Sequence, residues 1–321
     1  MSVDQRTPTR IETATAYAPA SVGNVAVGFD VLGHALDAVG DRVTVTRLAR
    51  PRVEIEEITG CEEALPLDPE QNTATAGLVA MLRELSLPFG FSVRIEKSIP
   101  LGSGMGGSAA SAVGGMVAAN ALLERPLPLS ELLRFALVGE AVASGSAHAD
   151  NLAPGLYGGL TLVRAMDPPD ILRIPVPDEI RCVLVHPHLR LDTRVARGVL
   201  PREIPMGLFV HQAANLAGFV VGCQTGDLEL IRRSFDDHVV EPHRAPLIQG
   251  FLAVKGAALE AGALGCSISG AGPSVFAWCV GDAVATAARE GMVAAFAAAG
   301  VQSDAFISPV GAPGARIVEA A

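Results

Sequence analysis

The chain has few of the residues that mark nucleic-acid-binding proteins. Aromatic residues make up 4% of its 321 positions, so platforms on which bases could stack are scarce. Acidic residues outnumber basic ones, which gives a net charge of −10, and no run of lysines or arginines offsets it. These shortages argue against a nucleic-acid-binding surface, and we expect no nucleic-acid partner.

Cysteine is sparse and long hydrophobic runs are missing. The five cysteines are Cys61, Cys182, Cys223, Cys266 and Cys279, and no two of them form a CxxC pair. An odd number at wide spacing predicts reduced thiols, with neither a zinc site nor a disulfide framework. The sequence has no uninterrupted apolar run of about 18 residues and no apolar segment in its first ten positions. We therefore expect no signal peptide, no membrane partner and a cytoplasmic location.

Glycine, by contrast, is concentrated in the stretch 100–111, which reads PLGSGMGGSAAS. The preceding segment, 91–97, alternates apolar and polar residues like a half-buried strand, and 109–123 is a small-residue run typical of a helix. A strand, a glycine-rich loop and a helix start together form an anion site, most often one for phosphate. The alternative is a tight turn that needs small residues for helix packing.

Two familiar phosphate loops can be compared with this stretch. The Walker A loop requires a Lys-Ser/Thr pair after its last glycine, but Ser108 and Ala109 follow Gly107. The spacing of Gly102, Gly104 and Gly107 does satisfy GxGxxG, the dinucleotide fingerprint. That fingerprint also expects an acidic residue about 20 positions on at a strand end. Glu124 lies near that distance, but prolines follow it closely. A nicotinamide dehydrogenase therefore stays open as an alternative.

The order of predicted elements favours an α+β fold with two domains, since strands and helices interleave without regular βαβ spacing. Predicted strands cover 13–18, 41–46, 52–58, 91–97, 158–164 and 181–186, with two more around a tight turn in 266–280. Predicted helices cover 72–85, 109–123, 129–144, 206–223, 228–235, 247–261 and 283–299. The stretch 166–177 carries four prolines, and we place the domain boundary there.

Three further polar stretches are candidates for a site. Residues 19–30 (PASVGNVAVGFD) place Asn24 and Asp30 among small apolar residues, where an acid usually has a charged partner or ligand. Residues 144–159 (SGSAHADNLAPGLYGG) gather His148, Asp150 and Asn151 on a predicted loop between a helix and a strand. Residues 267–274 (SISGAGPS) form a second glycine turn. Taken singly, each polar residue could be a turn cap and the last stretch a hairpin connection.

Taken together, the four stretches resemble the GHMP small-molecule kinases, and within them the branch that acts on L-homoserine. The resemblance spans about residues 13–315. It implies transfer of the γ-phosphate of ATP, with Mg²⁺, to the side-chain hydroxyl of L-homoserine, a step of threonine biosynthesis. It also implies an N-terminal ribosomal-protein-like α+β domain at 11–165, a C-terminal ferredoxin-like domain at 175–321, and a homodimer.

The resemblance assigns roles to individual positions. Nucleotide binding is implied for Asn72, Lys97, Pro100, Gly102, Ser103, Gly104, Met105, Gly106, Gly107 and Ser108. Magnesium binding is implied for Ser108 and Glu140, whose hard oxygen atoms suit that ion. Substrate binding is implied for Asn24, Asp30, His148, Asn151, Thr193, Arg197 and Arg244. Asn151, Asp150 and Lys97 are the expected catalytic residues, and we favour a mechanism in which Asp150 is not a required base.

The chain also departs from the family pattern, and other functions stay open. The usual loop reads GLGSSA, whereas Met105 replaces the leucine here and Gly107 replaces the first serine. We expect activity with a more flexible loop and weaker nucleotide binding. From pattern alone, Arg197 and Arg244 could equally be solvated or paired with neighbours such as Glu241. Open alternatives are a kinase of mevalonate, shikimate or a sugar, and a catalytically silent sensor.

Overall fold

Two β-sheets with helices packed on them make up the described part of the protein. The computed structural model describes residues 11–61, 63–144 and 149–321. The strands are β1 (Thr13–Gly23), β2 (Leu32–Leu48), β3 (Val53–Thr59), β4 (Gly90–Glu96), β5 (Leu160–Met166), β6 (Pro169–Ile174), β7 (Ile180–Pro187), β8 (Gly265–Ile268), β9 (Val275–Val280), β10 (Ser303–Pro309) and β11 (Arg316–Ala320). The helices are α1 (Thr73–Glu84), α2 (Gly107–Ala121), α3 (Leu129–Ser144), α4 (Ala149–Tyr157), α5 (Thr193–Gly198), α6 (Met206–Thr225), α7 (Leu228–Arg233), α8 (Glu241–Arg244), the 3₁₀ turn η1 (Ala245–Leu247), α9 (Phe251–Glu260) and α10 (Gly281–Ala298).

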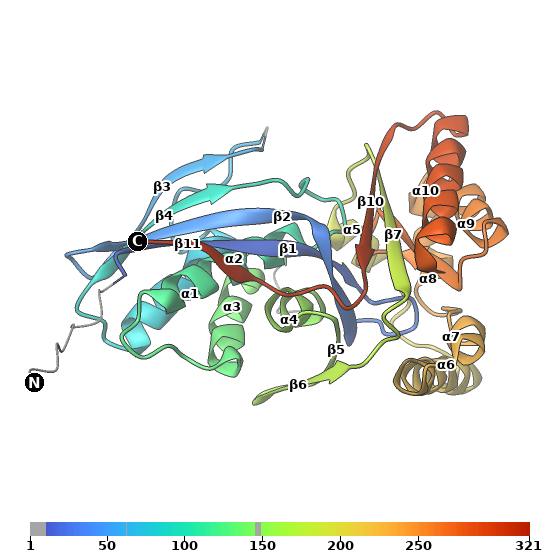
Figure 1. Ribbon diagram of the computed structural model, residues 1–321, viewed down its shortest axis with the longest axis horizontal. Helices are drawn as coiled ribbons and strands as arrows, with labels where there is room; N and C mark the ends of the chain where they lie inside the picture. The colour runs from blue at the N-terminus through green and yellow to red at the C-terminus, as the bar shows by residue number, and fades with distance from the viewer. Residues whose placement is uncertain (1–10, 62, 145–148) are drawn as a thin grey trace, which may run out of the picture.

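The first sheet has the strand order β11-β1-β2-β4-β3, with β5 pairing to β2 and β6 pairing to β5. Helices α1 to α4 lie along one face of it (Figure 1). Small residues allow this close approach. A Cβ atom on Gly114 of α2 would lie 2.8 Å from Val43 and 3.5 Å from the Cβ of Ala18 on the sheet. The small residues of β1 and α2 therefore allow the middle of α2 to pack closely against the sheet.

The second sheet is antiparallel, in the order β10-β7-β9-β8, and its strands β7, β8 and β9 are buried on both faces. Alternate residues of its strands belong to different cores, as the pleat requires. Val183 and Ala277 pack with α9 and α10, whereas Leu184 and Trp278 belong to the large core shared with the first sheet. The indole Nε1 of Trp278 donates a hydrogen bond of 3.2 Å to Nε2 of His34 on β2, which joins the two sheets.

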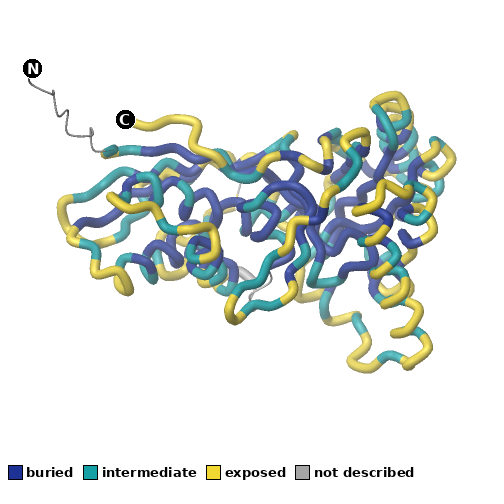
Figure 2. Tube along the Cα trace, turned by 60° about the horizontal axis from the view of Figure 1, so that its bottom comes forward, coloured by how far each residue is buried: buried dark blue, intermediate teal, exposed yellow. Residues whose placement is uncertain are grey.

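Three of the described strands lie where the sequence predicts none: β6 and β11 extend the first sheet, and β10 is an edge strand of the second. Strand β6 forms inside the proline-rich stretch 166–177. Strand β11 follows all the other described elements yet pairs with β1, aligning Ala320 with Ala14 (Figure 1). Its residues are exposed, as the yellow segment that ends at the C-terminus in Figure 2 shows. The predicted α+β class is confirmed. The division at 11–165 and 175–321 stays a prediction, and the strand pairing adds β6 and β11 to the first sheet.

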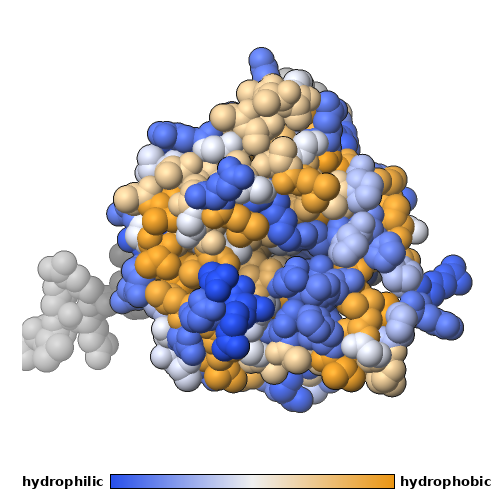
Figure 3. All heavy atoms as spheres, turned by 90° about the vertical axis from the view of Figure 1, so that its right-hand side faces the viewer, coloured by the Kyte–Doolittle hydropathy of each residue, from blue (hydrophilic) through white to orange (hydrophobic). Residues whose placement is uncertain are grey.

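The predicted loop carrying Asp150 and Asn151 is wrong in one respect. Both residues lie in the first turn of helix α4, and the buried Leu152 and Leu156 anchor this helix in the core. Among the described residues, α6 is the one helix long and apolar enough to cross a membrane by length and composition, and 17% of its apolar 18-residue window is buried. Figure 3 views the end of the molecule formed by the C-terminal part of the chain, where apolar and polar side chains alternate over the surface.

Candidate functional site

A cavity of about 610 Å³ lies between the two halves of the chain. Its walls combine most of the predicted site residues. From the first half come Asn24, Asp30, Asn72, Lys97, Pro100, Gly102, Ser103, Gly104, Gly106, Gly107, Ser108, Glu140, Asp150 and Asn151. From the second half come Thr193, Arg197 and Arg244. The predicted ligand residue His148 lies outside the described residues. The separate sequence motifs therefore converge on one space.

The glycine-rich stretch forms a loop that ends at the start of α2. Gly102, Gly104 and Gly106 have φ angles of 63°, 76° and 68°, a region that favours glycine. A Cβ on Gly104 would lie 2.5 Å from the carbonyl oxygen of Ser269. Gly106 is the N-cap of α2 and provides no side-chain capping bond. The first N–H groups of α2 and the positive end of its dipole are therefore available to an anion in the cavity.

Met105 is the one described member of the predicted nucleotide set that does not line the cavity. Its side chain is fully buried in the core beneath the loop. Its backbone carbonyl accepts a hydrogen bond of 3.0 Å from the N–H of Ser21 on β1. Met105 anchors the loop to the sheet, and this explains why an apolar residue interrupts the glycines.

The second glycine turn, 269–274, holds the loop from the C-terminal half. The hydroxyl of Ser269 donates a 2.7 Å hydrogen bond to the carbonyl of Gly104. The N–H of Ser274 donates to the carbonyl of Ser103 at 3.2 Å. The carbonyl of Gly270 accepts 2.8 Å bonds from the side chains of both Asn24 and Arg244. One turn thus contacts the glycine loop and the opposite end of the cavity.

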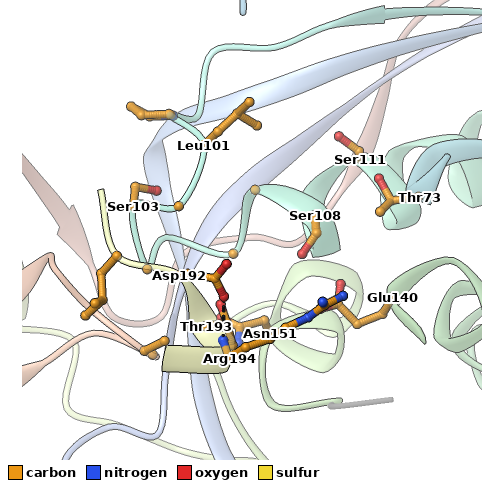
Figure 4. Close-up of a pocket in the computed structure, with 18 of the residues that line it drawn as sticks. Thr73, Leu101, Ser103, Ser108, Ser111, Glu140, Asn151, Asp192, Thr193 and Arg194 are labelled. Atoms are coloured by element: carbon orange, nitrogen blue, oxygen red, sulfur yellow. Dashed lines mark hydrogen bonds between the residues drawn. The ribbon is translucent and has the colours of Figure 1, made fainter. Parts of the chain in front are cut away.

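Ser108 and Glu140 supply oxygen atoms beside the start of α2. Figure 4 shows Ser108 in the first turn of α2, Glu140 on α3 and Asn151 on α4 around the same space. Burial raises the pKa of Glu140 to about 7, while a hydrogen bond from Ser108 lowers it. Among the described residues no cluster of three or more His, Cys, Asp or Glu side chains could hold a metal. One carboxylate and one hydroxyl nevertheless fit Mg²⁺, which usually takes one or two protein carboxylates together with substrate phosphates.

The other end of the cavity is made of charged side chains from distant segments. Asp30 forms a two-bond ion pair with Arg197, at 3.0 and 2.9 Å. Arg244 is 2% exposed and donates to the carbonyl of Ala196 at 3.0 Å. Both guanidinium groups lie over the ring of Phe29, at 5.2 and 5.4 Å from its centre. Opposite charges held this way match a ligand that carries both a cation and a carboxylate.

Asp150 and Asn151 lie between the two ends. Burial, and secondarily the negative charge of Asp30, raise the pKa of Asp150 to about 7. Its Oδ1 atom has no hydrogen-bond partner among the described residues. The Oδ1 atom of Asn151 accepts a 2.9 Å bond from Ser21, which fixes its amide. A buried carboxyl group with a free oxygen in a cavity is a candidate for proton handling or for a ligand contact.

Asn72 and Lys97 line the cavity but also bond to the protein. Oδ1 of Asn72 caps α1 by accepting from the N–H of Ala74 at 3.0 Å, and its Nδ2 donates to Pro66. The ammonium group of Lys97 donates to Asp41, to the carbonyl of Gly107 and to Ser111. An ammonium group has three N–H donors, so this arrangement leaves Lys97 none for a nucleotide.

Sequence reasoning missed several residues of this site. Asp41 lies in a predicted strand where nothing in the pattern indicates a charged residue buried beneath a loop. Arg190 and Asp192 line the cavity from the segment before α5, a helix that the sequence did not predict. Ser111 is the last residue of the glycine-rich stretch 100–111. Its position next to the loop is the one sequence feature that could have indicated a role in the site.

Comparison with known proteins agrees with this geometry. Residues 72–159 match the family model described as GHMP kinases N terminal domain, and 219–298 match GHMP kinases C terminal. The homoserine kinase of Xylella fastidiosa is 53% identical over 95% of this chain and 94% of its own length. That of Xanthomonas campestris is 51% identical over 96% of this chain and 95% of its own.

Solved structures of GHMP kinases are also similar to this chain. A homoserine kinase from Cytophaga hutchinsonii superposes with a TM-score of 0.93 at 43% identity, covering 99% of this chain and 100% of that one. The mevalonate kinase of L. major, at 15% identity and a TM-score of 0.68 over 94% of this chain and 98% of that one, shares the fold. The chain belongs to the GHMP kinases.

Proposed function

We propose that this chain transfers the γ-phosphate of ATP to the side-chain hydroxyl of L-homoserine, giving O-phospho-L-homoserine and ADP. One observation carries the proposal: a single cavity has a glycine loop at a helix N-terminus at one end and the charges of Asp30, Arg197 and Arg244 at the other. The family's reaction supplies ATP as a substrate, and the curated relatives above are homoserine kinases. The product belongs to threonine biosynthesis.

At the nucleotide end, the backbone of residues 102–108 binds the phosphates through its N–H groups and the dipole of α2. Pro100, Ser103 and Asn72 shape the wall beside it. Ser108 and Glu140 would hold Mg²⁺, which when bound supplies positive charge that offsets charge on the transferred phosphoryl group. The protein's own contribution is positioning, because phosphoryl transfer demands little covalent chemistry from it.

At the substrate end, Asp30 pairs with the ammonium group of L-homoserine and Arg197 and Arg244 bind its carboxylate. Asn24 and Thr193 fix the orientation of the amino acid, and His148 belongs to the same proposed set. Asn151, held by Ser21, lies where it can orient the reacting hydroxyl. The internal pair of Asp30 with Arg197 keeps both charges in place until a zwitterion separates them.

Asp150 is the candidate for accepting the hydroxyl proton. Its pKa of about 7 leaves it partly ionised near neutrality, a range in which a carboxylate can act as a base. We favour a reaction in which Asp150 orients the site and is not required to accept the proton of the substrate hydroxyl. The proposal also includes a cytoplasmic location, no nucleic-acid or membrane partner, and a homodimer. Size-exclusion chromatography with light scattering on the purified protein tests the homodimer.

The testing experiment is a coupled ADP-release assay with Mg²⁺ and ATP. It compares L-homoserine with mevalonate, shikimate and L-serine. We expect turnover on L-homoserine to exceed that on the others by orders of magnitude, because mevalonate and shikimate lack the ammonium group that Asp30 would bind. Preferred turnover of another hydroxy acid would discard the assignment of Asp30, Arg197 and Arg244. Nucleotide binding without turnover of any substrate would favour a silent sensor.

A further inference from the structure

Both ends of the glycine loop are hydrogen-bonded to the same buried ion pair. The loop leaves strand β4 through residues 97–99 and enters α2 at Gly107. Asp41, from the middle of β2, and Lys97, just after β4, form an ion pair directly beneath these two points. Asp41 is fully buried and Lys97 is 5% exposed. None of the roles assigned above uses Asp41.

The carboxylate of Asp41 holds the entry of the loop. Its Oδ1 atom accepts hydrogen bonds from the backbone N–H groups of Ser98, at 2.9 Å, and Ile99, at 3.1 Å. Its Oδ2 atom accepts from Lys97 and, at 3.0 Å, from the hydroxyl of Ser111 on α2. All four acceptor positions of the carboxylate are thereby used within the protein.

The ammonium group of Lys97 holds the exit. It donates 2.8 Å hydrogen bonds to the carbonyl of Gly107, the first residue of α2, and to the hydroxyl of Ser111. With Asp41 as the third partner, its donors are also all used. A carbonyl in the first turn of a helix fixes the direction of the neighbouring N–H groups, because each peptide unit is planar. Lys97 therefore acts on the phosphate-binding N–H groups through Gly107.

Buried ion pairs contribute little to net stability, because removing two charges from water offsets their attraction. Their value lies in fixing one arrangement of the groups that they bond. Here those groups are the two ends of the glycine loop. We propose that Asp41 and Lys97 are positioning residues that pre-organise the loop for nucleotide phosphates without touching them. The inference rests on the nucleotide part of the proposed function and does not depend on the identity of the phosphate acceptor.

The test compares Asp41→Asn, Lys97→Met and the double variant by calorimetric titration with ADP and Mg²⁺. The positioning role predicts that each single variant weakens ADP binding about tenfold and that the double variant is no worse than either. The KM for the phosphate acceptor should change less than twofold. If Lys97 instead contacts phosphate directly, Asp41→Asn frees the ammonium group of Lys97, and ADP binding stays equal or tightens. In that case Lys97→Met is the one single variant that weakens ADP binding. That outcome would overturn the proposal.

A second measurement separates this proposal from the proposed function and from misfolding. Hydrogen exchange of peptides covering 97–111 in the nucleotide-free protein should accelerate in Asp41→Asn and, more weakly, in Ser111→Ala. Asp37→Asn is the matched control, since Asp37 lies on the same strand and pairs with Arg316 away from the cavity. Unchanged exchange in Asp41→Asn contradicts the proposal even if the wild-type chain binds no ADP. Far-UV circular dichroism establishes that each variant is folded.

Discussion

The two ends of the cavity are built in opposite ways. The nucleotide end is mostly backbone from one continuous segment, 97–111, whose glycines adopt conformations that other residues avoid. The substrate end is mostly side chains from three distant segments, with Asp30, Arg197 and Arg244 brought together by the fold. A backbone site is sensitive to added atoms, whereas a side-chain site is sensitive to changed charge. Substitutions of these two kinds should therefore separate the ends.

The largest effect should come from adding one methyl group at the nucleotide end. In Gly104→Ala the new Cβ would lie 2.5 Å from the carbonyl of Ser269, at a φ of 76°. The left-handed conformation alone costs about 1–2 kcal/mol, and relieving the contact must displace the 269–274 turn. We expect kcat/KM for ATP to fall at least about 100-fold, measured by ADP release. Gly207→Ala is the control, since nothing lies within 4 Å of its Cβ. Equal activity of the two variants would contradict a backbone-built site.

The next effect should come from changing charge geometry at the substrate end. Arg197→Lys keeps the positive charge but cannot reproduce the two-bond pairing seen with Asp30. A lost charged hydrogen bond costs about 1.5–3 kcal/mol, so kcat/KM for L-homoserine should fall about 10- to 100-fold. The dissociation constant of ADP should stay within about twofold. The exposed Arg202→Lys is the control. Weakened ADP binding in Arg197→Lys would show that the two ends are not separable.

The pH dependence distinguishes the two buried carboxyl groups. Burial raises the pKa of Glu140 from 4.5 to about 7, so it becomes protonated, and loses its capacity to hold Mg²⁺, as pH falls below about 7. Activity should decline on that side. Because a bound cation favours the ionised carboxylate, more Mg²⁺ should move the decline to lower pH. The measurement is kcat/KM for ATP against pH at two Mg²⁺ concentrations. If the decline of kcat/KM at low pH does not depend on the Mg²⁺ concentration and is absent in Asp150→Asn, the titrating group is Asp150.

Asp150→Asn should change stability more than turnover. We expect kcat within about tenfold of the wild type, and a loss of several orders of magnitude would make Asp150 the required base. The pKa of Asp150 rises from 3.8 to about 7 on folding, so its neutral form stabilises the fold at low pH. That contribution diminishes as pH rises from about 4 to 7 and is lost above 7, where ionisation costs about 4 kcal/mol. Thermal denaturation should therefore show a higher Tm for Asp150→Asn at pH 8, with the gain shrinking toward pH 4.

The smallest effect should come from restoring the family's serine at position 107. A Cβ there would lie 3.2 Å from the Cγ2 atom of Ile99, so the isoleucine must shift slightly. Serine also restores a hydroxyl to the loop and stiffens the start of α2. We expect ADP binding to tighten about two- to threefold, by titration calorimetry. Weaker binding would show that contact with Ile99 outweighs these gains.

What could be predicted from sequence follows the same division. The glycine-rich segment could be interpreted locally because the alternating strand 91–97, the glycines of 100–111 and the small-residue helix 109–123 follow one another directly in the sequence. No local pattern connects Asp30 to Arg197, 167 positions away. The family resemblance assigned both residues to substrate binding, but it did not predict that they pair with each other. The helix carrying Asp150 was missed because Gly and Pro residues around 154–159 are typical of a loop, although burial of Leu152 and Leu156 stabilises the helix. Asp41 gave no signal, since an isolated acid in a strand is usually solvated.

The position of β11 has a consequence for how the protein is made. Strand β1 leaves the ribosome before the other described strands and helices, and its partner β11 follows all of them. Until β11 arrives, β1 presents an open edge, with the N–H and C=O groups that it later shares with residues 316–320 still unpaired. Domains generally fold during synthesis in N-to-C order, but this sheet has to wait for the C-terminal half. The nascent chain should therefore depend on chaperones most strongly over the interval in which this edge is uncovered.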